Sequence, residues 1–397
     1  MRNRIGGLRR ITLGAAVVAA SGWALVGAQS TGPVKAGRMV PTFEYDETFP
    51  KPLPNHWVVG TVVGVDVDAK QHIWIAQRAA TIRPDELHAE AKPPLGECCA
   101  KAPYIIEFDH AGNFVQGWGG PSPTHQYDWP TDGVQGPDPS AGQGPSGMHS
   151  VFVDHQDHVW LTATGPGDGQ ILKFTRDGKF LLQIGHPNRP KPDSNDTENM
   201  NKSSGITEYV KTNEMFVSDG YGNRRVIVFD EDTGKYKRHW GAYGKRPDDS
   251  IPFIYNPNKP FEQFSVVHGI GVSNDGLVYA CDRNGSRVQV FHLDGTFIME
   301  KLIEPQTLNG TVFGIAFSAD PEQQFAYIPD GRNEKVWILD RKSLDIIGSF
   351  GCPGHAGGCM TTPHSIATDA QGNIYSGETW EGKRVQRYLF KGLRPQS

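Results

Sequence analysis

The stretch HGIGVSNDGLVYACDRNGSRVQVFHLDGTFIME, residues 268–300, contains one full structural unit of this chain. An apolar strand leads into a turn with Asn and Gly, and a second strand of the VYACD type follows. A third strand, RVQVF, continues through the turn LDG into a last strand. Short apolar runs rich in β-branched and aromatic residues, divided by such turns, are typical of antiparallel β-structure. The stretch therefore predicts one four-stranded sheet.

The same plan recurs along the chain with a period of roughly fifty residues, which is the spacing of a repeat architecture. The other copies begin with VGVDVDAKQHIWIAQR, HSVFVDHQDHVWLTAT, SGITEYVKTNEMFVSD, FGIAFSADPEQQFAYIPD and HSIATDAQGNIYSGET. Six four-stranded units indicate an all-β fold, a six-bladed β-propeller. An array of β-sandwiches is the alternative, but it does not account for the last copy, which stops after three strands.

The missing strand of the last unit has a candidate near the N-terminus. A closed ring must hide the edges of its sheets. The segment TFEYDETF, residues 42–49, lies outside the six copies and is a candidate for this strand. We therefore predict that this N-terminal strand closes the ring, and that no second domain is present.

The first residues carry the signals of an exported protein. Four arginines precede an apolar run over residues 11–26, and Val26 and Ala28 occupy the −3 and −1 places of a signal-peptidase site. The segment RRITL also resembles a twin-arginine export signal. An uncleaved membrane anchor is the alternative, although the run is short for a membrane span.

These boundaries give three segments. We predict a signal peptide over residues 1–28, an N-terminal segment with the ring-closing strand over 29–55, and a six-bladed propeller over 56–397. The mature protein is then periplasmic or secreted. The net charge of −5 is mild, so we expect no nucleic-acid partner and no membrane contact beyond the export signal. We expect a monomer.

Cysteine usage agrees with an oxidising compartment. Cys352 and Cys359 enclose the loop CPGHAGGC, which favours a local disulfide. A metal held by these two residues and His355 is the alternative, and the adjacent Cys98 and Cys99 are further partners for this loop. The fifth cysteine, Cys281, is expected to be buried and free.

Histidines at the start of alternate units are the main functional signal. In a propeller blade the first strand lines the central channel, and its starting position is, in the six units, Val63, His149, Ser204, His268, Phe313 and His364. Alternate blades of a six-bladed ring lie about 120° apart, so the three imidazoles should converge on the axis. Three neutral imidazoles suit Zn²⁺ or a similar divalent cation with positions left open for substrate. The alternative is that each histidine is an ordinary buried residue. Other histidines, such as His155, His158 and His355, fall in turns or loops and are assigned no role.

The end of the second strand lies at the same face and carries further polar residues. Arg78 follows IWIAQ and Arg283 follows VYACD at the same slot, whereas Gly220 takes that slot in the third unit and Tyr221 comes next. We expect the two arginines and the tyrosine to surround the metal site. Other polar residues recur in so many units that we assign them a structural role: Arg225, Arg287, Arg384, Asp219, Asp282, Asp330 and Glu378.

Long insertions should wall the mouth of the channel on this face, since long loops on a rigid scaffold commonly carry specificity. They are residues 79–102, 119–147, 186–203 and 241–263. Their aromatic residues are candidates for lining a pocket: Tyr127, Trp129, Phe253 and Tyr255.

The motif FVSDGYGNRRVIVF, residues 216–229, points to a known family. Together with the histidine and arginine positions, it resembles the lyase domain of peptidylglycine α-amidating enzymes, a six-bladed propeller of the NHL-repeat type. The resemblance runs from about residue 56 to residue 390 of the sequence. It implies that Tyr221 is the catalytic base and that Arg78 and Arg283 are active-site arginines. It also implies that zinc is bound by His149, His268 and His364.

The reaction that this resemblance implies is the cleavage of a carbinolamide, an α-hydroxyglycine at a peptide C-terminus, to an amide and glyoxylate. Zn²⁺ can activate the substrate hydroxyl, and a neighbouring cation and arginine favour a tyrosine that acts as a base. The second arginine can hold a carboxylate in a bidentate fork. The implied partner is a small molecule or a peptide C-terminus.

The sequence departs from this family in two places. The family's structural calcium uses two backbone carbonyls, matching Val65 and Val151, and an aspartate whose position is Ser365 here. A neutral serine is a poor Ca²⁺ ligand beside a carboxylate, which speaks against calcium. Gly222 stands where the family has a disulfide cysteine.

Two other functions therefore remain open. One is a metal-dependent hydrolase of the lactonase or esterase type, in which metal-bound hydroxide attacks a carbonyl; the lost calcium ligand favours such divergence. The other is a non-enzymatic propeller that binds a periplasmic partner, which the fold alone permits.

Overall fold

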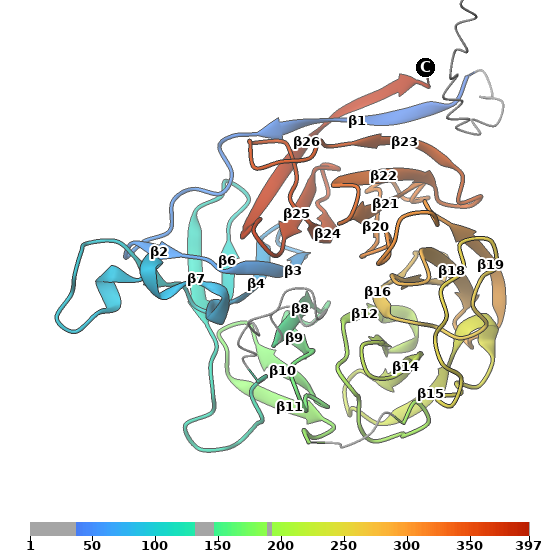
Figure 1. Cartoon of the computed structure of the whole chain (residues 1–397), viewed down its shortest axis with the longest axis horizontal. Helices are drawn as coiled ribbons and strands as arrows, with labels where there is room; N and C mark the ends of the chain where they lie inside the picture. Colours follow the sequence, from blue (N-terminus) through green and yellow to red (C-terminus); the bar gives the residue numbers. More distant parts are fainter. Residues whose placement is uncertain (1–36, 132–146, 189–192, 397) are drawn as a thin grey trace, which may run out of the picture. The chain divides into compact units, whose positions relative to one another are not determined.

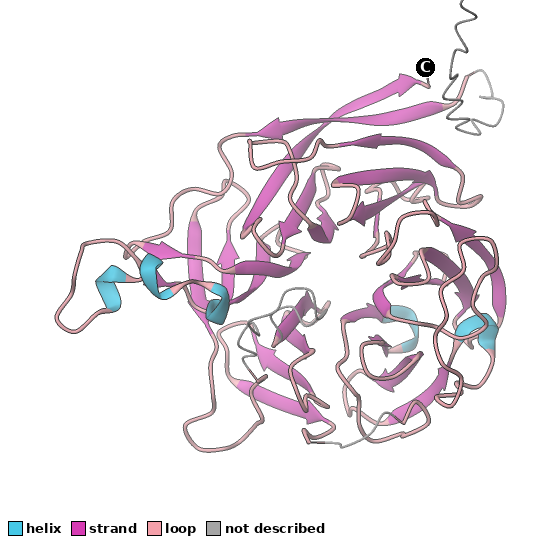
Figure 2. Cartoon of the chain, viewed as in Figure 1, coloured by secondary structure: helices cyan, strands magenta, loops and turns pink. Residues whose placement is uncertain are grey.

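The computed structural model describes residues 37–131, 147–188 and 193–396. The predicted signal peptide over residues 1–28 lies outside these ranges. The described chain forms six four-stranded sheets arranged around a central channel (Figure 1). Nearly all the regular structure is strand, and the helices are single short turns (Figure 2). The predicted all-β, six-bladed propeller is confirmed.

The strands of each blade follow one another from the channel outward. The first three blades contain β3 (Thr61–Val67), β4 (Ile73–Arg78), β6 (Ile105–Phe108) and β7 (Phe114–Trp118); β8 (Met148–Val153), β9 (His158–Ala163), β10 (Ile171–Thr175) and β11 (Phe180–Ile184); and β12 (Gly205–Tyr209), β13 (Glu214–Asp219), β14 (Arg225–Asp230) and β15 (Tyr236–Trp240). The last three contain β16 (Val267–Val272), β17 (Leu277–Asp282), β18 (Arg287–His292) and β19 (Phe297–Leu302); β20 (Ala316–Phe317), β21 (Phe325–Asp330), β22 (Lys335–Asp340) and β23 (Ile346–Phe350); and β24 (Pro363–Thr368), β25 (Ile374–Glu378), β26 (Arg384–Pro395) and β1 (Met39–Asp46).

Strand β1 closes the ring as predicted, although its bounds differ from residues 42–49. It pairs antiparallel with β26 and places Tyr45 opposite Tyr388. The strand ends at Asp46 because that carboxylate turns back to accept hydrogen bonds from the Thr48 N–H and hydroxyl at 2.9 and 2.7 Å. Phe49 then leaves the sheet and is buried. The end of the segment is therefore an anchor against the neighbouring blades rather than part of the strand.

The hydrophobic core lies between the blades. Buried side chains of the described residues form one cluster at each of the six blade interfaces. Trp74 of β4 packs with Val151 and Leu161 of the next blade, for example. Each inner strand is thus covered on both faces, which explains why strands such as IWIAQR are nearly continuous apolar runs.

One turn recurs between the first and second strands of several blades. Asp68, Asp154 and Asp369 each accept backbone N–H bonds from the residues two and four positions later. The other carboxylate oxygen accepts a bond at 2.9 to 3.0 Å from an aromatic side chain of the following strand: Trp74, Trp160 or Tyr375. The aspartate therefore fixes both the turn and the start of the second strand.

The recurrent acids at the end of the second strand are structural, as predicted. Asp219, Asp282 and Glu378 pair with the first residue of the third strand, at 2.9, 3.0 and 3.0 Å: Arg225, Arg287 and Arg384. In the fifth blade, where that residue is a lysine, Asp330 accepts a bond from Trp337 Nε1 instead. Removing one partner would leave a buried charge without compensation.

The first insertion differs from the expectation for it, whereas residues 132–146 and 189–192 of two others lie outside the described ranges. Residues 79–102 contain the 3-10 turns η1 (Ala79–Thr81), η2 (Pro84–Glu86) and η3 (His88–Glu90), and β5 (Ala100–Lys101) pairs in parallel with β2 (Trp57–Val58). Most of this insertion extends outward from the first blade, away from the channel (Figure 1). The wall that it was expected to form is therefore absent from this part of the described chain. The remaining short turns are η5 (Val210–Thr212) and η6 (Ala242–Gly244).

The aromatic residues of the other insertions pack against neighbours. Tyr127 and Trp129 contact Phe174 of the second blade at ring distances of 5.1 and 6.3 Å. Phe253 contacts Phe261 at 5.2 Å. These contacts pack the described parts of the insertions onto their neighbours, and lining of a pocket by these aromatic residues stays a prediction.

The cysteines settle the choices that the sequence left open. Cys352 and Cys359 form the predicted local disulfide, so their thiols are not available for a metal with His355. Cys98 and Cys99 are bonded to each other rather than to that loop. Cys281 is buried and free. Within the described ranges, no helix has the length and apolar character needed to cross a membrane.

Candidate metal and active site

Three histidines meet on the propeller axis. His149 belongs to β8, His268 to β16 and His364 to β24, and their exposed fractions are 1, 2 and 5 %. The ring centroids lie 4.6 to 4.8 Å apart in each of the three pairs. The convergence expected from alternate blades is therefore present in the structure.

The backbone fixes how each imidazole is turned. The Nδ1 atoms of His149, His268 and His364 lie 2.7, 2.5 and 2.8 Å from backbone carbonyls of the next blade: Ser204, Phe313 and Val63. A carbonyl can only accept, so each Nδ1 must carry the proton and donate it. Each Nε2 then keeps its lone pair. Such backbone support is typical of histidines that bind metals.

The electrostatic surroundings keep these rings neutral. Burial is the main cause that lowers the pKa of His364 to about 3, and the positive charges of Arg78 and Arg283 add to it. Burial and the neighbouring groups lower the pKa of His149 and His268 well below the ordinary value as well. Three neutral, buried nitrogen donors fit Zn²⁺ or a similar divalent cation. The identity of the metal is a matter of proposal.

Tyr221 lies directly beside the histidines. Its hydroxyl oxygen is 3.3 Å from His149 Nε2 and 3.1 Å from His268 Nε2. It accepts a hydrogen bond from Arg283 Nη1 at 2.7 Å, and the Arg283 guanidinium also lies over the Tyr221 ring at 5.0 Å. The tyrosine and one arginine are therefore where the sequence placed them.

Arg78 reaches the same site from the end of β4. Its Nε donates to the Met148 carbonyl at 2.8 Å and its Nη2 to Thr164 Oγ1 at 3.2 Å. The side chain is buried, and its charge lowers the pKa of His149 and His364. The second predicted arginine is thus a fixed positive charge next to the histidines.

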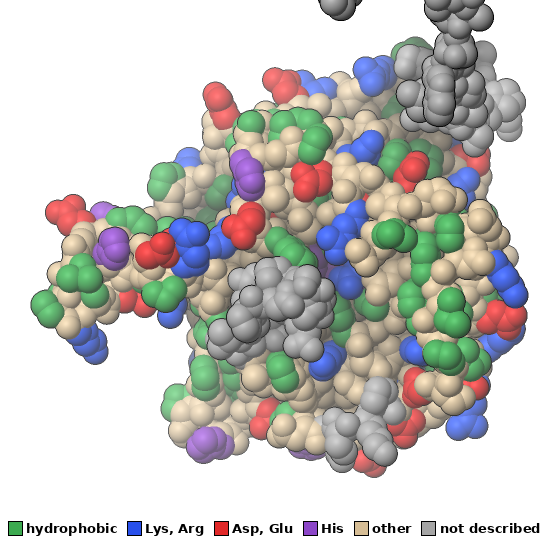
Figure 3. All heavy atoms as spheres, in the orientation of Figure 1, with side chains coloured by type: hydrophobic (Ala, Val, Ile, Leu, Met, Phe, Trp, Pro, Cys, Tyr) green, Lys and Arg blue, Asp and Glu red, His purple; other side chains and the backbone are tan. Residues whose placement is uncertain are grey.

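Arg332 is a residue of this site that sequence reasoning missed. It follows Asp330 and Gly331 as Tyr221 follows Asp219 and Gly220, and this matching DGR and DGY spacing was the available signal. Its side chain is exposed, but partial burial of the guanidinium and the positive charge of Arg283 lower the pKa of Arg332. Lys and Arg side chains are visible around the middle of the face in Figure 3.

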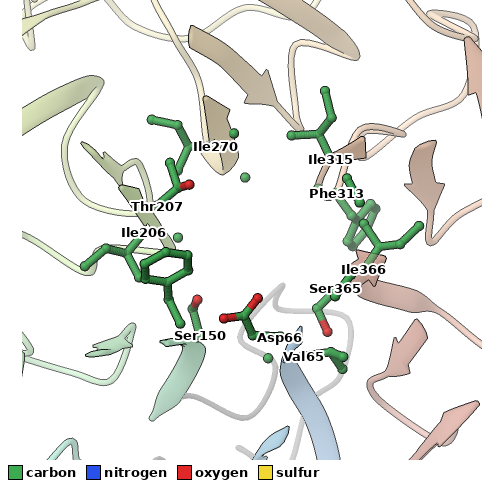
Figure 4. A pocket seen from close by; sticks show the side chains of 18 of the residues that line it. Val65, Asp66, Ser150, Ile206, Thr207, Ile270, Phe313, Ile315, Ser365 and Ile366 are labelled. Carbon is green, nitrogen blue, oxygen red and sulfur yellow. The ribbon is translucent and has the colours of Figure 1, made fainter. Parts of the chain in front are cut away.

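Below the histidines the channel continues as a cavity of about 250 Å³. The cavity is lined by the three residues that match the family's structural calcium site: Val65, Val151 and Ser365. Asp66 also lines it, and Figure 4 shows its carboxylate pointing into the opening. Its Oδ2 accepts the Val153 N–H at 2.7 Å. Sequence reasoning missed this acid, although a carboxylate inside the inner strand VGVDVD was a visible signal.

The channel position of Asp66 has a measurable effect on stability. Burial raises its pKa from 3.8 to about 7. The folded protein thus holds a proton on Asp66 that the unfolded chain has already released, and stability falls as the pH rises through this window. In chelator-treated protein, the unfolding free energy of Asp66→Asn minus that of wild type is expected to be about 2 kcal/mol larger at about pH 8 than at about pH 5. Urea unfolding of both proteins at both pH values measures this difference. The same difference at the two pH values would contradict the prediction.

Comparisons with known proteins agree with the fold. Residues 264–291, the three inner strands of the fourth blade, match the model of the NHL repeat. The chain is 24 % identical over 237 residues to peptidyl-glycine alpha-amidating monooxygenase B of Xenopus laevis, covering 58 % of this chain and 25 % of the relative. It is 28 % identical over 239 residues to the Mus musculus monooxygenase, covering 58 % and 22 %. The match thus spans about a quarter of the length of these relatives.

A solved structure supports the fold alone. A protein of unknown function from Bacteroides thetaiotaomicron has a TM-score of 0.52 at 13 % identity, covering 89 % of this chain and 77 % of that chain. The repeat match, the similarity to the monooxygenases and the ring of six sheets lead to one conclusion. The chain is a six-bladed β-propeller of the NHL-repeat type.

Proposed function

We propose that this propeller is a divalent-metal-dependent lyase that cleaves the C–N bond of a carbinolamide. The substrate is a peptidyl-α-hydroxyglycine or a related α-hydroxy-N-acyl compound, and the products are an amide and glyoxylate. The observation that carries the proposal is the position of the Tyr221 hydroxyl, between two histidine Nε2 atoms and the Arg283 guanidinium. The similarity to the amidating monooxygenases supports the same reaction class.

His149, His268 and His364 would hold the metal through their Nε2 atoms, and a bound Zn²⁺ or similar cation supplies a Lewis acid for the substrate hydroxyl. Tyr221, as the base, removes the proton from that hydroxyl. The electrons of the O–H bond form the C=O bond of glyoxylate as the C–N bond breaks. The nitrogen leaves with the electrons of the C–N bond and receives the proton, so the reaction needs no oxidant or reductant.

The arginines divide two tasks. Arg283 donates to the Tyr221 oxygen at 2.7 Å and so stabilises negative charge on it. Arg78 is held by the Met148 carbonyl and Thr164, which fixes a positive charge beside the histidines for the substrate carboxylate. Arg332 at the mouth adds a solvent-accessible positive charge on the path of an anionic substrate.

The direct test is an activity assay on purified protein loaded with Zn²⁺. Release of glyoxylate from α-hydroxyhippurate supports the lyase. Hydrolysis of lactones without glyoxylate release would replace it with the hydrolase. If protein with one bound metal per chain acts on neither class of substrate, the non-enzymatic binding propeller is the function that remains.

Arg332 is expected to act on substrate capture rather than on the chemical step. Arg332→Gln should raise KM for α-hydroxyhippurate about tenfold, since it removes a positive charge that attracts the anionic substrate to the mouth, and leave kcat nearly unchanged. The methyl ester of the substrate, which lacks the carboxylate, serves as the control. Equal effects on acid and ester would show that Arg332 does not act through the charge of the carboxylate.

We also propose that the protein is exported. The signal over residues 1–28 predicts it, and the Cys352–Cys359 disulfide supports an oxidising compartment. Recovery of the processed chain from the periplasm or medium tests this.

A further inference from the structure

A second cluster of ligand-type side chains lies at the other end of β8 from His149. His155 belongs to the turn after β8, Glu208 to β12 of the next blade and Glu231 to the turn after β14. One possible ligand atom from each lies within 4.8 Å of the other two. The cluster therefore bridges the second and third blades, far along the strand from the axial histidines.

Glu231 is the unusual member of this cluster. Its side chain is 0 % exposed, and neither carboxylate oxygen has a hydrogen-bond partner among the described residues. The Nδ1 atom of His155 lies 3.4 Å from Glu231 Oε1. A buried carboxylate without partners is costly unless a proton or a cation compensates it.

The lysine beside this cluster pairs with a different carboxylate. Asp154 accepts from Trp160 Nε1 at 2.9 Å and pairs with Lys173 Nζ at 3.2 Å, so the ammonium already has a carboxylate partner. Lys173 contacts only the backbone carbonyl of Glu231, at 3.4 Å. The Glu231 carboxylate is thus left without a hydrogen-bond partner among the described residues, and a divalent cation would supply one.

The geometry leaves a route for an ion. Glu208 Oε2 lies 2.7 Å from His155 Nδ1, and the side chains of His155 and Glu208 are 37 and 13 % exposed. The buried carboxylate therefore forms the floor of the cluster and His155 its solvent-facing side. One imidazole and two carboxylates, with water on the open side, are a donor set that suits Zn²⁺ or Mn²⁺.

We propose that His155, Glu208 and Glu231 bind one divalent transition-metal ion that joins the second and third blades, independently of the axial histidines. The ligands come from three separate turns or strands of two blades, so binding requires the assembled interface. An ion that binds only the folded protein stabilises it by mass action. The site is thus a structural one, distinct from the proposed active site.

The experiment compares metal binding in variants of the full mature chain. Protein stripped with a chelator is titrated with Zn²⁺ and, separately, Mn²⁺, and the bound metal is counted after dialysis. The triple variant with His149→Ala, His268→Ala and His364→Ala is expected to retain one equivalent of bound metal. Adding Glu231→Gln to this variant is expected to remove that equivalent. Because the axial site is absent from both proteins, the result does not depend on the proposed lyase activity.

Controls separate metal binding from folding. Added to the axial-histidine variant, Asp232→Asn changes an exposed acid next to Glu231 and should keep the bound metal. His155→Asn in the same background should lose the metal, as Glu231→Gln does. Saturating metal should raise the Tm of the axial-histidine variant by about 5 °C and leave the Tm unchanged once Glu231→Gln is added. Absence of metal from the axial-histidine variant, or an unchanged equivalent after Glu231→Gln and His155→Asn, would overturn the proposal.

Discussion

Tyr221→Phe is expected to lower kcat for glyoxylate release by about a thousandfold, because a positioned general base typically contributes a factor of 10² to 10⁴. The substitution removes only the hydroxyl that Arg283 and two histidines surround. The ring, its packing under the Arg283 guanidinium and the three imidazoles stay in place. Single-turnover kinetics with α-hydroxyhippurate measure the effect on the chemical step.

Metal content provides the matched control for this variant. Tyr221→Phe should bind the axial metal as wild type does, since the three Nε2 donors are unchanged. A variant that keeps its metal and more than a tenth of the wild-type kcat would show that Tyr221 is not the base. The proposed mechanism would then lose its central residue, although the metal site would stand.

His268→Ala is expected to remove the axial metal and to lower turnover by at least about 10³-fold, since Lewis-acid activation contributes several kcal/mol and each 1.36 kcal/mol is a factor of ten. His268 is 2 % exposed, and its Nδ1 bond to the Phe313 carbonyl holds the ring toward the axis. Metal analysis of dialysed protein, together with the glyoxylate assay, measures both effects.

Two comparisons make this result specific. His355→Ala, in the exposed disulfide loop, should retain metal and activity. Exogenous imidazole, which fits the space left by the deleted side chain, should restore part of both in His268→Ala. Full turnover in His268→Ala without bound metal would exclude the proposed metal-dependent lyase.

The features that repeat were predictable from the sequence, because a repeat converts a position in the chain into a position in space. His149, His268 and His364 share one slot of the unit, and Arg78 and Arg283 share another. Once the ring of blades was inferred, their convergence followed from its symmetry. The proton on each Nδ1 did not follow, since it depends on carbonyls of the adjacent blade.

The features that occur once were harder to predict. The parallel pairing of Trp57 with Ala100, which organises the first insertion, is non-local and leaves no periodic pattern. Asp66 interrupts an apolar strand without a counterpart in other units, so nothing in the repeat explained it. Glu231 follows an ordinary strand end, and only the neighbouring blade shows that it is buried.

The pairing of β1 with β26 joins the first and the last strand of the propeller. Thr42 Oγ1 donates to the Gly392 carbonyl across 350 positions of the chain. A contact of such sequence separation forms late, because the whole intervening polypeptide must first be brought together. Until β26 has been synthesised, β1 is therefore an unpaired strand edge that other chains can capture. Shielding by a chaperone during this interval should raise the yield of native protein.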